Sequence, residues 1–258
     1  MKVIAIVAQK GGTGKTTTAG AVAAYLSEHR KRTLVIDLND QGDLTDTLGA
    51  DTATSGALKV LTGGPIIGTA AETNLTSIDI LTGAEELARA ETLISLTGRE
   101  RAMILKNALR PVRRYYSYCV IDAPGAFNTA MLNTLAAADS VIIPAKADFY
   151  SLRGIKRLTD NIQAVKQDIN PDLIVAGILL TQYQGRRNLS RDIVEILQGA
   201  ETALQTKLFN TKIRENSKIA EAPGRRESVL TYAPGSIGAA DYRAFLTEYF
   251  NNITGGKL

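Results

Sequence analysis

A glycine-rich segment near the amino terminus carries the residue types that bind phosphate. Residues 9–17 read Gln-Lys-Gly-Gly-Thr-Gly-Lys-Thr-Thr and directly follow an apolar run. Backbone N–H groups of such a loop surround phosphate oxygens, and the N-terminus of the next helix adds a positive dipole. Lys15 is placed to reach the terminal phosphates, and the Thr16 hydroxyl is a ligand for Mg²⁺. The segment predicts a nucleotide site. It departs from the strict motif in having Gln9 where glycine is required, and it adds a second lysine, Lys10.

An aspartate at the end of a later apolar run is a second candidate for this site. Asp122 follows Val120 and Ile121 and precedes Ala-Pro-Gly. At a strand end beside the phosphate loop, its carboxylate would hold Mg²⁺ through water. The alternative is structural, with Asp122 only capping the helix that follows.

The elements that must position these residues alternate along the chain. Short apolar runs rich in β-branched residues predict strands, and longer segments with apolar residues at helical spacing predict helices between them. The expected strands are Val3–Ala8, Thr33–Asp37, Cys119–Asp122, Ser140–Pro144 and Leu173–Leu180, and the expected helices are Thr16–Arg30, Leu81–Leu109 and Leu152–Gln167. Uninterrupted apolar strands indicate a parallel sheet covered on both faces. We therefore predict an α/β fold with a mostly parallel twisted sheet, forming a single domain over residues 1–251, and a short tail over residues 252–258.

Composition excludes several classes of protein. The chain has 258 residues, of which 45% are hydrophobic and 22% charged, so it can bury a core without disulfides. One cysteine and one histidine cannot build a zinc site or a cysteine-ligated iron–sulfur cluster within one subunit. The apolar run that opens the chain is too short for a signal peptide, and no segment is long enough to span a membrane. We expect a cytoplasmic protein.

Positive charge is concentrated in the C-terminal third. Between Tyr183 and Arg226 there are nine basic and five acidic residues, and this excess of four equals the whole net charge. A solvated surface explains such a distribution, and so does a nucleic-acid footprint. The tandem pairs Arg186-Arg187 and Arg225-Arg226 keep the second interpretation open.

Residues 10–17 also carry a resemblance to a known family. Lys-Gly-Gly-x-Gly-Lys-Thr-Thr is the deviant Walker A signature of the ParA/MinD ATPases, and the chain resembles the small, Soj-like ParA branch from end to end. The resemblance implies a P-loop NTPase-like fold, with ATP and Mg²⁺ as cofactors. It also implies that Lys10 contacts phosphate across a nucleotide-sandwich dimer, so that ATP binding and homodimer formation are one event. The nucleotide contacts implied are Lys10, Gly11, Gly12, Thr13, Gly14, Lys15, Thr16 and Thr17 and, on the adenine side, Ile213 and Arg214.

Two further segments resemble the switches of that family. Residues 37–43 are similar to Asp-x-Asp-Pro-Gln-Gly-Asn, with Asn39 in place of the second aspartate and Asp40 in place of proline. The resemblance assigns catalytic and metal-binding roles to Asp37 and the positioning of water to residue 39. An amide orients water but takes no proton, so we predict a slow ATPase with a long-lived ATP dimer, unless Asp40 partly substitutes. The segment from Asp122 resembles the second switch, with Gly125 replacing a proline.

The C-terminal third contains the segments that separate ParA-like proteins from other deviant Walker ATPases. Residues 177–190, 209–216, 221–223 and 232–242 are similar to the family's segments. The resemblance implies that nonspecific DNA binding resides in this region, with Arg186 and Lys218 as the best candidates and Arg187, Arg214 and Arg225 as weaker ones. Such binding would be to phosphates and strongly salt-dependent.

These resemblances predict a DNA-partition ATPase. An ATP–Mg²⁺ dimer would bind nonspecific double-stranded DNA on the nucleoid, and hydrolysis stimulated by a ParB-like centromere-binding partner would release it. The main alternative is a MinD-like or other cargo-positioning ATPase. No membrane binding is expected, because residues 245–258 contain one lysine and a glycine pair rather than a basic amphipathic helix. A nucleotide-dependent DNA clamp that hydrolyses almost nothing unaided is also open. A nitrogenase-iron-protein-like reductase fails because there is only one cysteine, and no substrate pocket for a biosynthetic ligase is identified.

Overall fold

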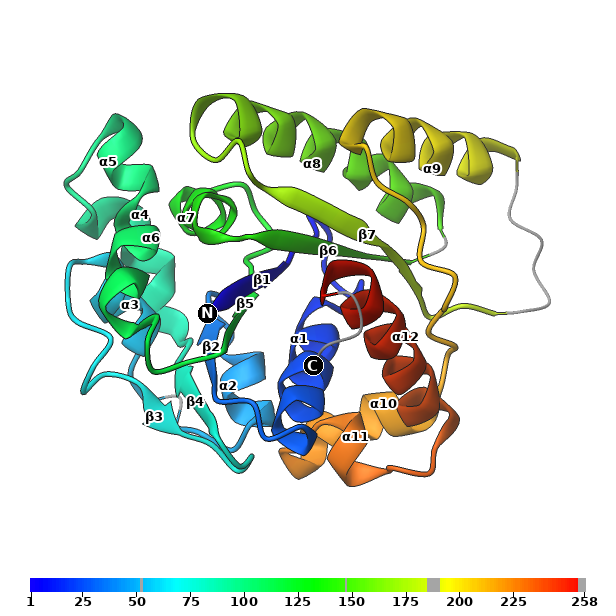
Figure 1. The fold of residues 1–258 in the computed structure, drawn as a ribbon, viewed down its shortest axis with the longest axis horizontal. Coiled ribbons are helices and arrows are strands. Elements are labelled where there is room, and N and C mark those ends of the chain that lie inside the picture. Colours follow the sequence, from blue (N-terminus) through cyan, green and yellow to red (C-terminus); the bar gives the residue numbers. More distant parts are fainter. Residues whose placement is uncertain (52, 147, 185–190, 255–258) are drawn as a thin grey trace.

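The fold is built around one sheet with helices on both sides. The computed structural model describes residues 1–51, 53–146, 148–184 and 191–254. In this part of the chain the sheet has seven strands in the order β3-β4-β2-β5-β1-β6-β7 (Figure 1). Their bounds are β1 Lys2–Ile6, β2 Thr33–Asp37, β3 Ala71–Glu72, β4 Ile78–Leu81, β5 Tyr118–Asp122, β6 Ser140–Lys146 and β7 Ile174–Thr181. All neighbouring strands are parallel except β3 and β4. The predicted α/β class with a mostly parallel sheet is confirmed.

The helices form two layers. The α-helices are α1 Lys15–Glu28, α2 Asp43–Thr47, α3 Gly56–Leu61, α4 Ala90–Leu93, α5 Gly98–Ala102, α6 Ile104–Leu109, α7 Thr129–Ala137, α8 Phe149–Asp168, α9 Arg191–Leu204, α10 Ser217–Glu221, α11 Val229–Tyr232 and α12 Ile237–Thr254. Short 3₁₀ turns occupy Glu85–Arg89, Arg110–Val112 and Ala222–Arg225. Figure 1 shows α7, α8 and α9 on one face of the sheet and α1 and α12 on the other.

Alternate residues of each strand enter different cores. In β5, Cys119 and Ile121 join the core under α3 and α6–α9, whereas Val120 joins the core formed with α1 and α12. Successive side chains of a strand point to opposite faces, so a strand covered on both sides must be apolar throughout. This is why the central strands appear in the sequence as continuous apolar runs.

The segment between β2 and β5 differs from the prediction of one helix over Leu81–Leu109. Leu81 ends β4, where it is fully buried, and the rest is divided into a 3₁₀ turn and three short helices. Helix α4 ends before Ile94, which takes an extended conformation, and Gly98, with a φ of 53°, begins α5. One continuous helix is therefore wrong here, because Leu87, Leu105 and Leu109 of the separate short elements pack into the core shared with α3 and α7.

The last helix of the described chain belongs to the domain. Helix α12 runs to Thr254, and the predicted start of a tail at residue 252 stays a prediction. Phe245, Tyr249 and Phe250 of this helix are buried, so it belongs to the domain core. Residues 255–258 lie outside the described part of the chain.

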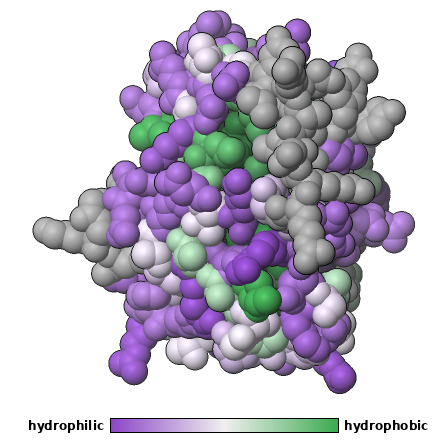
Figure 2. Space-filling model, turned by 90° about the vertical axis from the view of Figure 1, so that its right-hand side faces the viewer, coloured by the Kyte–Doolittle hydropathy of each residue, from purple (hydrophilic) through white to green (hydrophobic). Residues whose placement is uncertain are grey.

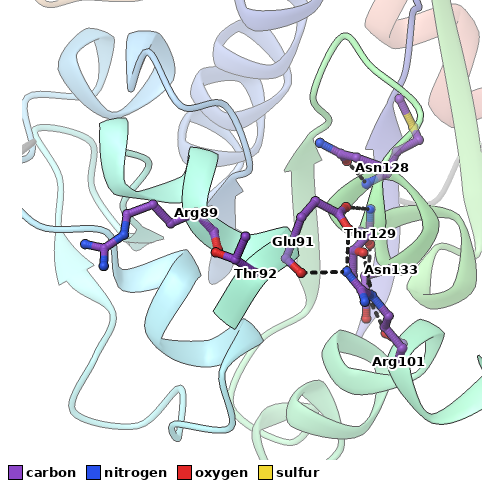
Figure 3. Close-up of polar contacts among 8 residues, drawn as sticks. Arg89, Glu91, Thr92, Arg101, Asn128, Thr129 and Asn133 are labelled. Carbon is purple, nitrogen blue, oxygen red and sulfur yellow. Dashed lines mark hydrogen bonds and ion pairs between the residues drawn. The ribbon is translucent and has the colours of Figure 1, made fainter. Parts of the chain in front are cut away.

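A polar cluster fastens the short helices to α7 (Figure 3). Glu91 accepts a hydrogen bond of 2.5 Å from the Thr129 amide through Oε1, and its other carboxylate oxygen contacts the Arg101 guanidinium. Arg101 Nε donates to the Thr129 hydroxyl at 2.7 Å. Asn133, which is completely buried, donates to the Arg101 carbonyl at 2.7 Å and accepts from the Leu105 amide at 2.9 Å. Helix α7 follows the predicted second switch, so this cluster holds one end of that switch.

Candidate nucleotide and magnesium site

The glycine loop connects the carboxyl end of β1 to α1, as predicted. Gly12 and Gly14 have φ angles of 71° and 84°, in the left-handed region that favours glycine. The loop is held from the end of β7, because the Thr181 hydroxyl donates to the Thr13 carbonyl and Gln182 Nε2 donates to the Gly12 carbonyl, both at 2.8 Å. The sequence patterns do not predict these supports, although both residues follow directly on an expected strand.

Lys15 is the first residue of α1 and lies between this loop and the second switch. Burial lowers the pKa of the Lys15 ammonium, and the nearby Asp122 carboxylate opposes that shift. A Cβ added at Gly125 would lie 3.9 Å from Lys15 Nζ. The position of Gly125 in the second switch therefore leaves space directly beside the lysine.

Asp122 has the geometry expected of a magnesium-site residue. Thr16 Oγ1 donates to Asp122 Oδ2 at 2.7 Å. The other carboxylate oxygen, Oδ1, is buried and has no hydrogen-bond partner in the described part of the chain. Burial, followed by repulsion from Asp37, raises the pKa of Asp122 well above its usual range. An unpaired buried oxygen is costly, and water bound to a cation satisfies it, so Thr16 and Asp122 fit Mg²⁺.

Asp37 lies directly beside Asp122 but is engaged differently. The two aspartates are paired in register at the ends of β2 and β5. Asp37 Oδ2 accepts from the Thr45 amide at 2.9 Å and the Thr45 hydroxyl at 2.8 Å, and Oδ1 accepts from the Asn39 amide at 3.0 Å. Burial raises the pKa of Asp37 too. Both oxygens therefore hold the first switch in place, and the predicted catalytic and metal roles of Asp37 stay predictions.

The two departures from the family pattern lie at the turn of the first switch. Asn39 and Asp40 are both half-buried. Asn39 Oδ1 accepts from the Gln41 amide at 3.4 Å, and Asp40 Oδ1 accepts from Gln41 Nε2 at 3.2 Å. Gln41 thus contacts both side chains that could orient water.

Lys10 contacts a carboxylate of a distant segment. Its ammonium lies 3.3 Å from Asp148 Oδ1, next to the start of α8. The side chains are 43% and 34% exposed, so the ion pair is accessible to solvent and weak. Asp148 is a further site residue that the sequence patterns do not predict, because it is 138 residues from Lys10.

A cavity of about 520 Å³ opens beside the glycine loop on the side of α10 and α12. Its lining includes Gly14 and Thr17 from the loop and helix, and Ile213 and Arg214, the two residues predicted on the adenine side. Arg214 is fixed by Asp241, whose Oδ1 and Oδ2 accept from Nη2 at 2.6 Å and from Nε at 2.9 Å. The structure thus brings two of the predicted loop contacts, Gly14 and Thr17, and both adenine-side residues to one cavity.

The predicted DNA-binding residues are less completely described. Arg186 and Arg187 lie outside the described residues. Lys218 contacts Glu221 Oε2 at 2.6 Å, and Arg214 is paired with Asp241. Arg225 is exposed, with no carboxylate within 4 Å among the residues that the structure describes. Figure 2, which views the side of α10 and α12, shows a mainly hydrophilic surface with hydrophobic residues gathered in a few places.

The phosphate loop, the buried aspartate and the parallel sheet define a P-loop nucleotide-binding protein. Residues 1–175 match the family model of an AAA domain, AAA_31. The chain is 35% identical to the chromosome partitioning protein ParA of Myxococcus xanthus, over 98% of this chain and 89% of that protein. It is 33% identical to the sporulation initiation inhibitor protein Soj of Bacillus subtilis, over 97% and 99% of the two chains. The chain belongs to the ParA/Soj family of chromosome-partitioning ATPases, as the sequence resemblance predicts.

Solved structures share the whole fold. A structure described as cobyrinic acid a,c-diamide synthase from Mycobacterium smegmatis, with bound ATP analog and magnesium, has a TM-score of 0.84 and 30% identity, covering 100% of this chain and 97% of that one. A complex of a Cyanothece McdA variant with ATP has a TM-score of 0.82 at 22% identity, covering 100% and 98%, which shows the common fold alone. Among the described residues, no helix has the length and apolar character needed to cross a membrane.

Proposed function

We propose that this ATPase binds ATP with Mg²⁺ at residues 10–17 and uses the nucleotide to control DNA binding in a partition system. The observation that carries the nucleotide part is the unpaired, buried Asp122 Oδ1 next to Thr16 and Lys15. The bound ATP analog and magnesium of the Mycobacterium smegmatis structure support the same cofactors. The partition role is supported by relatives of that name that match nearly the full length of the chain.

Different residues of the site bind the phosphates, hold Mg²⁺ and orient the attacking water. The loop amides and Lys15 bind the phosphates, while Thr16 and Asp122 hold Mg²⁺. When bound, Mg²⁺ neutralises charge that develops on the phosphate oxygens. Asn39 orients the attacking water but cannot accept its proton, so unaided hydrolysis is slow. Gln41, which contacts Asn39, limits the positions that its amide can take.

Lys10 links nucleotide binding to formation of the homodimer. In the dimer, its ammonium leaves Asp148 and supplies positive charge to the phosphates bound by the other subunit. A weak, solvent-accessible ion pair with Asp148 allows that exchange. The joined subunits present Lys218 and Arg225, together with Arg186, Arg187 and Arg214, to nonspecific DNA on the nucleoid. A ParB-like partner that stimulates hydrolysis would then end this ATP-dependent DNA binding.

DNA binding in different nucleotide states tests this function. We would titrate a nonspecific duplex at low and moderate salt, with ADP or with ATP and Mg²⁺. Native protein should bind the duplex more tightly with ATP and Mg²⁺ than with ADP, and both Lys10→Ala and the double variant Lys218→Glu/Arg225→Glu should lose that gain. Lys59→Glu/Arg89→Glu, which changes the same net charge at exposed residues elsewhere, is the matched control. If ATP adds no affinity, the basic residues are a solvated surface, and a MinD-like role with another cargo replaces the partition function.

A further inference from the structure

A second group of basic residues lies at the edge of the sheet opposite the nucleotide site. Residues at or before the first residue of β2, β5 and β1, three neighbouring strands, supply it. We call it the amino-edge surface, and it consists of Lys2, Arg30, Lys31, Arg32, Arg110, Arg113 and Arg114. The glycine loop, Asp37 and Asp122 lie at the carboxyl ends of these strands. Since each strand has five residues, the two edges are about 17 Å apart.

Backbone contacts bring the three segments together. The Ser117 amide donates to the Arg32 carbonyl at 2.7 Å, and the Lys2 amide donates to the Ser117 carbonyl at 2.9 Å. Arg113 Nη2 donates to the Met1 carbonyl at 3.0 Å. Adjacent strands are about 4.8 Å apart, so the segments before β2 and β1 are separated by about 10 Å. The basic residues therefore form one surface.

The charges of this surface are largely unneutralised. Lys31 is half-buried and the other six side chains are exposed. Only Arg113 has a carboxylate within 4.0 Å in the described part of the chain, that of Asp139. Two carboxylates at this edge have other donors, because Asp79 accepts from the Tyr116 hydroxyl and Asp139 from the Val3 amide, both at 2.7 Å. The surface therefore presents concentrated positive charge to solvent.

Two of the guanidinium groups are held over tyrosine rings. The guanidinium carbon of Arg114 lies 4.7 Å from the ring centre of Tyr115, and Nη2 donates to the hydroxyl of that tyrosine at 2.6 Å. The guanidinium carbon of Arg32 lies 5.7 Å from the ring centre of Tyr116. A guanidinium held in this way loses less freedom on binding, and its planar fork matches phosphate oxygens. Five of the seven basic residues are arginines, which favours phosphate as the ligand.

We propose that the amino-edge surface binds the sugar-phosphate backbone of duplex DNA, whatever nucleotide the protein holds. It is separate from the predicted DNA-binding residues between positions 186 and 225 and gives the protein a second DNA contact. Duplex DNA carries one charge per about 1.7 Å of its axis, so a surface about 10 Å wide meets several phosphates. A membrane is disfavoured because Tyr115 is the only large exposed apolar side chain within these segments. A protein partner would require an apolar interface core, which this surface lacks.

Duplex binding in the ADP state tests the proposal without requiring the ATP dimer. We would titrate a labelled nonspecific duplex at several low salt concentrations with native protein and with Arg110→Glu/Arg114→Glu. The control is Arg89→Glu/Arg99→Glu, an equal change of charge at two exposed residues, of which Arg89 extends away from its labelled neighbours (Figure 3). Circular dichroism and thermal melting would establish that all variants fold. The amino-edge variant should lose about tenfold or more in affinity, and the slope of log K against log salt should fall by about two. The control variant should change the affinity much less.

Three results would overturn the proposal. They are no duplex binding with ADP at low salt, an equal loss in both double variants, and binding to phosphatidylglycerol-containing vesicles without binding to duplex. The further affinity gained with ATP and Mg²⁺ is measured in the same titrations and should disappear in Lys10→Ala. If native protein shows no ATP-dependent gain but keeps its ADP-state binding, the proposed function is contradicted and the amino-edge surface remains supported.

Discussion

Two aspartates in equivalent positions have different contacts. Asp37 and Asp122 end neighbouring strands in register, and both are completely buried. Thr45 and Asn39 donate to both oxygens of Asp37, whereas Asp122 keeps one oxygen without a donor among the described residues. Asp37 therefore fastens the first switch, and the unpaired oxygen of Asp122 fits a water ligand of the proposed Mg²⁺.

The rate of hydrolysis should respond to a single change in the first switch. Asn39→Asp restores a group that can accept a proton, and general-base catalysis contributes roughly 10²–10⁴-fold, so we expect kcat to rise by at least about tenfold. Phosphate release under saturating ATP and Mg²⁺ measures this effect. Asn39→Ala should leave almost no activity, while Asp40→Ala should have little effect. A strong loss in Asp40→Ala alone would assign the water to Asp40 instead.

Stability of the nucleotide-free protein should depend on pH through Asp122. Its raised pKa means that the folded protein retains a proton that the unfolded chain releases above pH of about 4. The folded state therefore binds more protons, and the free energy of unfolding should fall as pH rises toward the raised pKa. Urea unfolding at a series of pH values measures the slope. Asp122→Asn should reduce the slope, and an unchanged slope in that variant would show that Asp122 is already ionised.

The first switch depends on the segment that follows β4. The Gly83 amide donates to the Thr45 hydroxyl at 2.8 Å, the same hydroxyl that donates to Asp37. A Cβ added at Gly83 would lie 2.6 Å from the Asn39 carbonyl oxygen and 2.7 Å from Asp37 Cγ. The turn after β4 thus sets how closely the first switch can pack.

Gly83→Ala should consequently destabilise the fold and slow hydrolysis. Overpacking of this kind costs about 1–3 kcal/mol, and displacement of Asn39 should lower kcat. Denaturant unfolding and phosphate release measure the two effects. Gly154→Ala in α8 is the matched control, because its Cβ would meet nothing within 4 Å, and it should stabilise the protein by up to about 1 kcal/mol. Equal stability of both variants would mean that the turn relaxes around the new methyl group.

At the scale of the whole molecule, the length of the strands separates the candidate nucleotide site from the proposed DNA-binding surface. The nucleotide residues lie at the carboxyl ends of the strands and the amino-edge surface at the opposite ends. A dimer joined through the glycine loops would leave the amino edge of each subunit facing solvent.

Nucleotide binding should stabilise the monomer separately from assembly. ATP with Mg²⁺ at a hundredfold excess over Kd should add about 2.7 kcal/mol, and each kcal/mol raises Tm by about 2–4 °C in a protein of this size. Lys10→Ala should keep most of this shift in a thermal melt but remain a monomer in light scattering. Native protein should form a dimer under the same conditions. Loss of the thermal shift in Lys10→Ala would instead place Lys10 within its own subunit's phosphate site.

Local chemistry in the sequence was sufficient to predict the central strands, the glycine loop and the position of Asp122 at the end of a strand. Apolar runs buried on both faces, and glycines that take left-handed conformations, leave signals within a few residues. The same local signals failed between Leu81 and Leu109, where short helices pack into the core shared with α3 and α7 instead of forming one helix.

Contacts between distant residues were decided only by the tertiary structure. Lys10 and Asp148 are 138 residues apart, and Thr181 supports a loop carbonyl 168 residues away. The amino-edge surface likewise combines segments that meet because β2, β5 and β1 are neighbours in the sheet but not in the chain. Strand order follows from packing of the whole core, so no local pattern specifies which charges the sheet brings together.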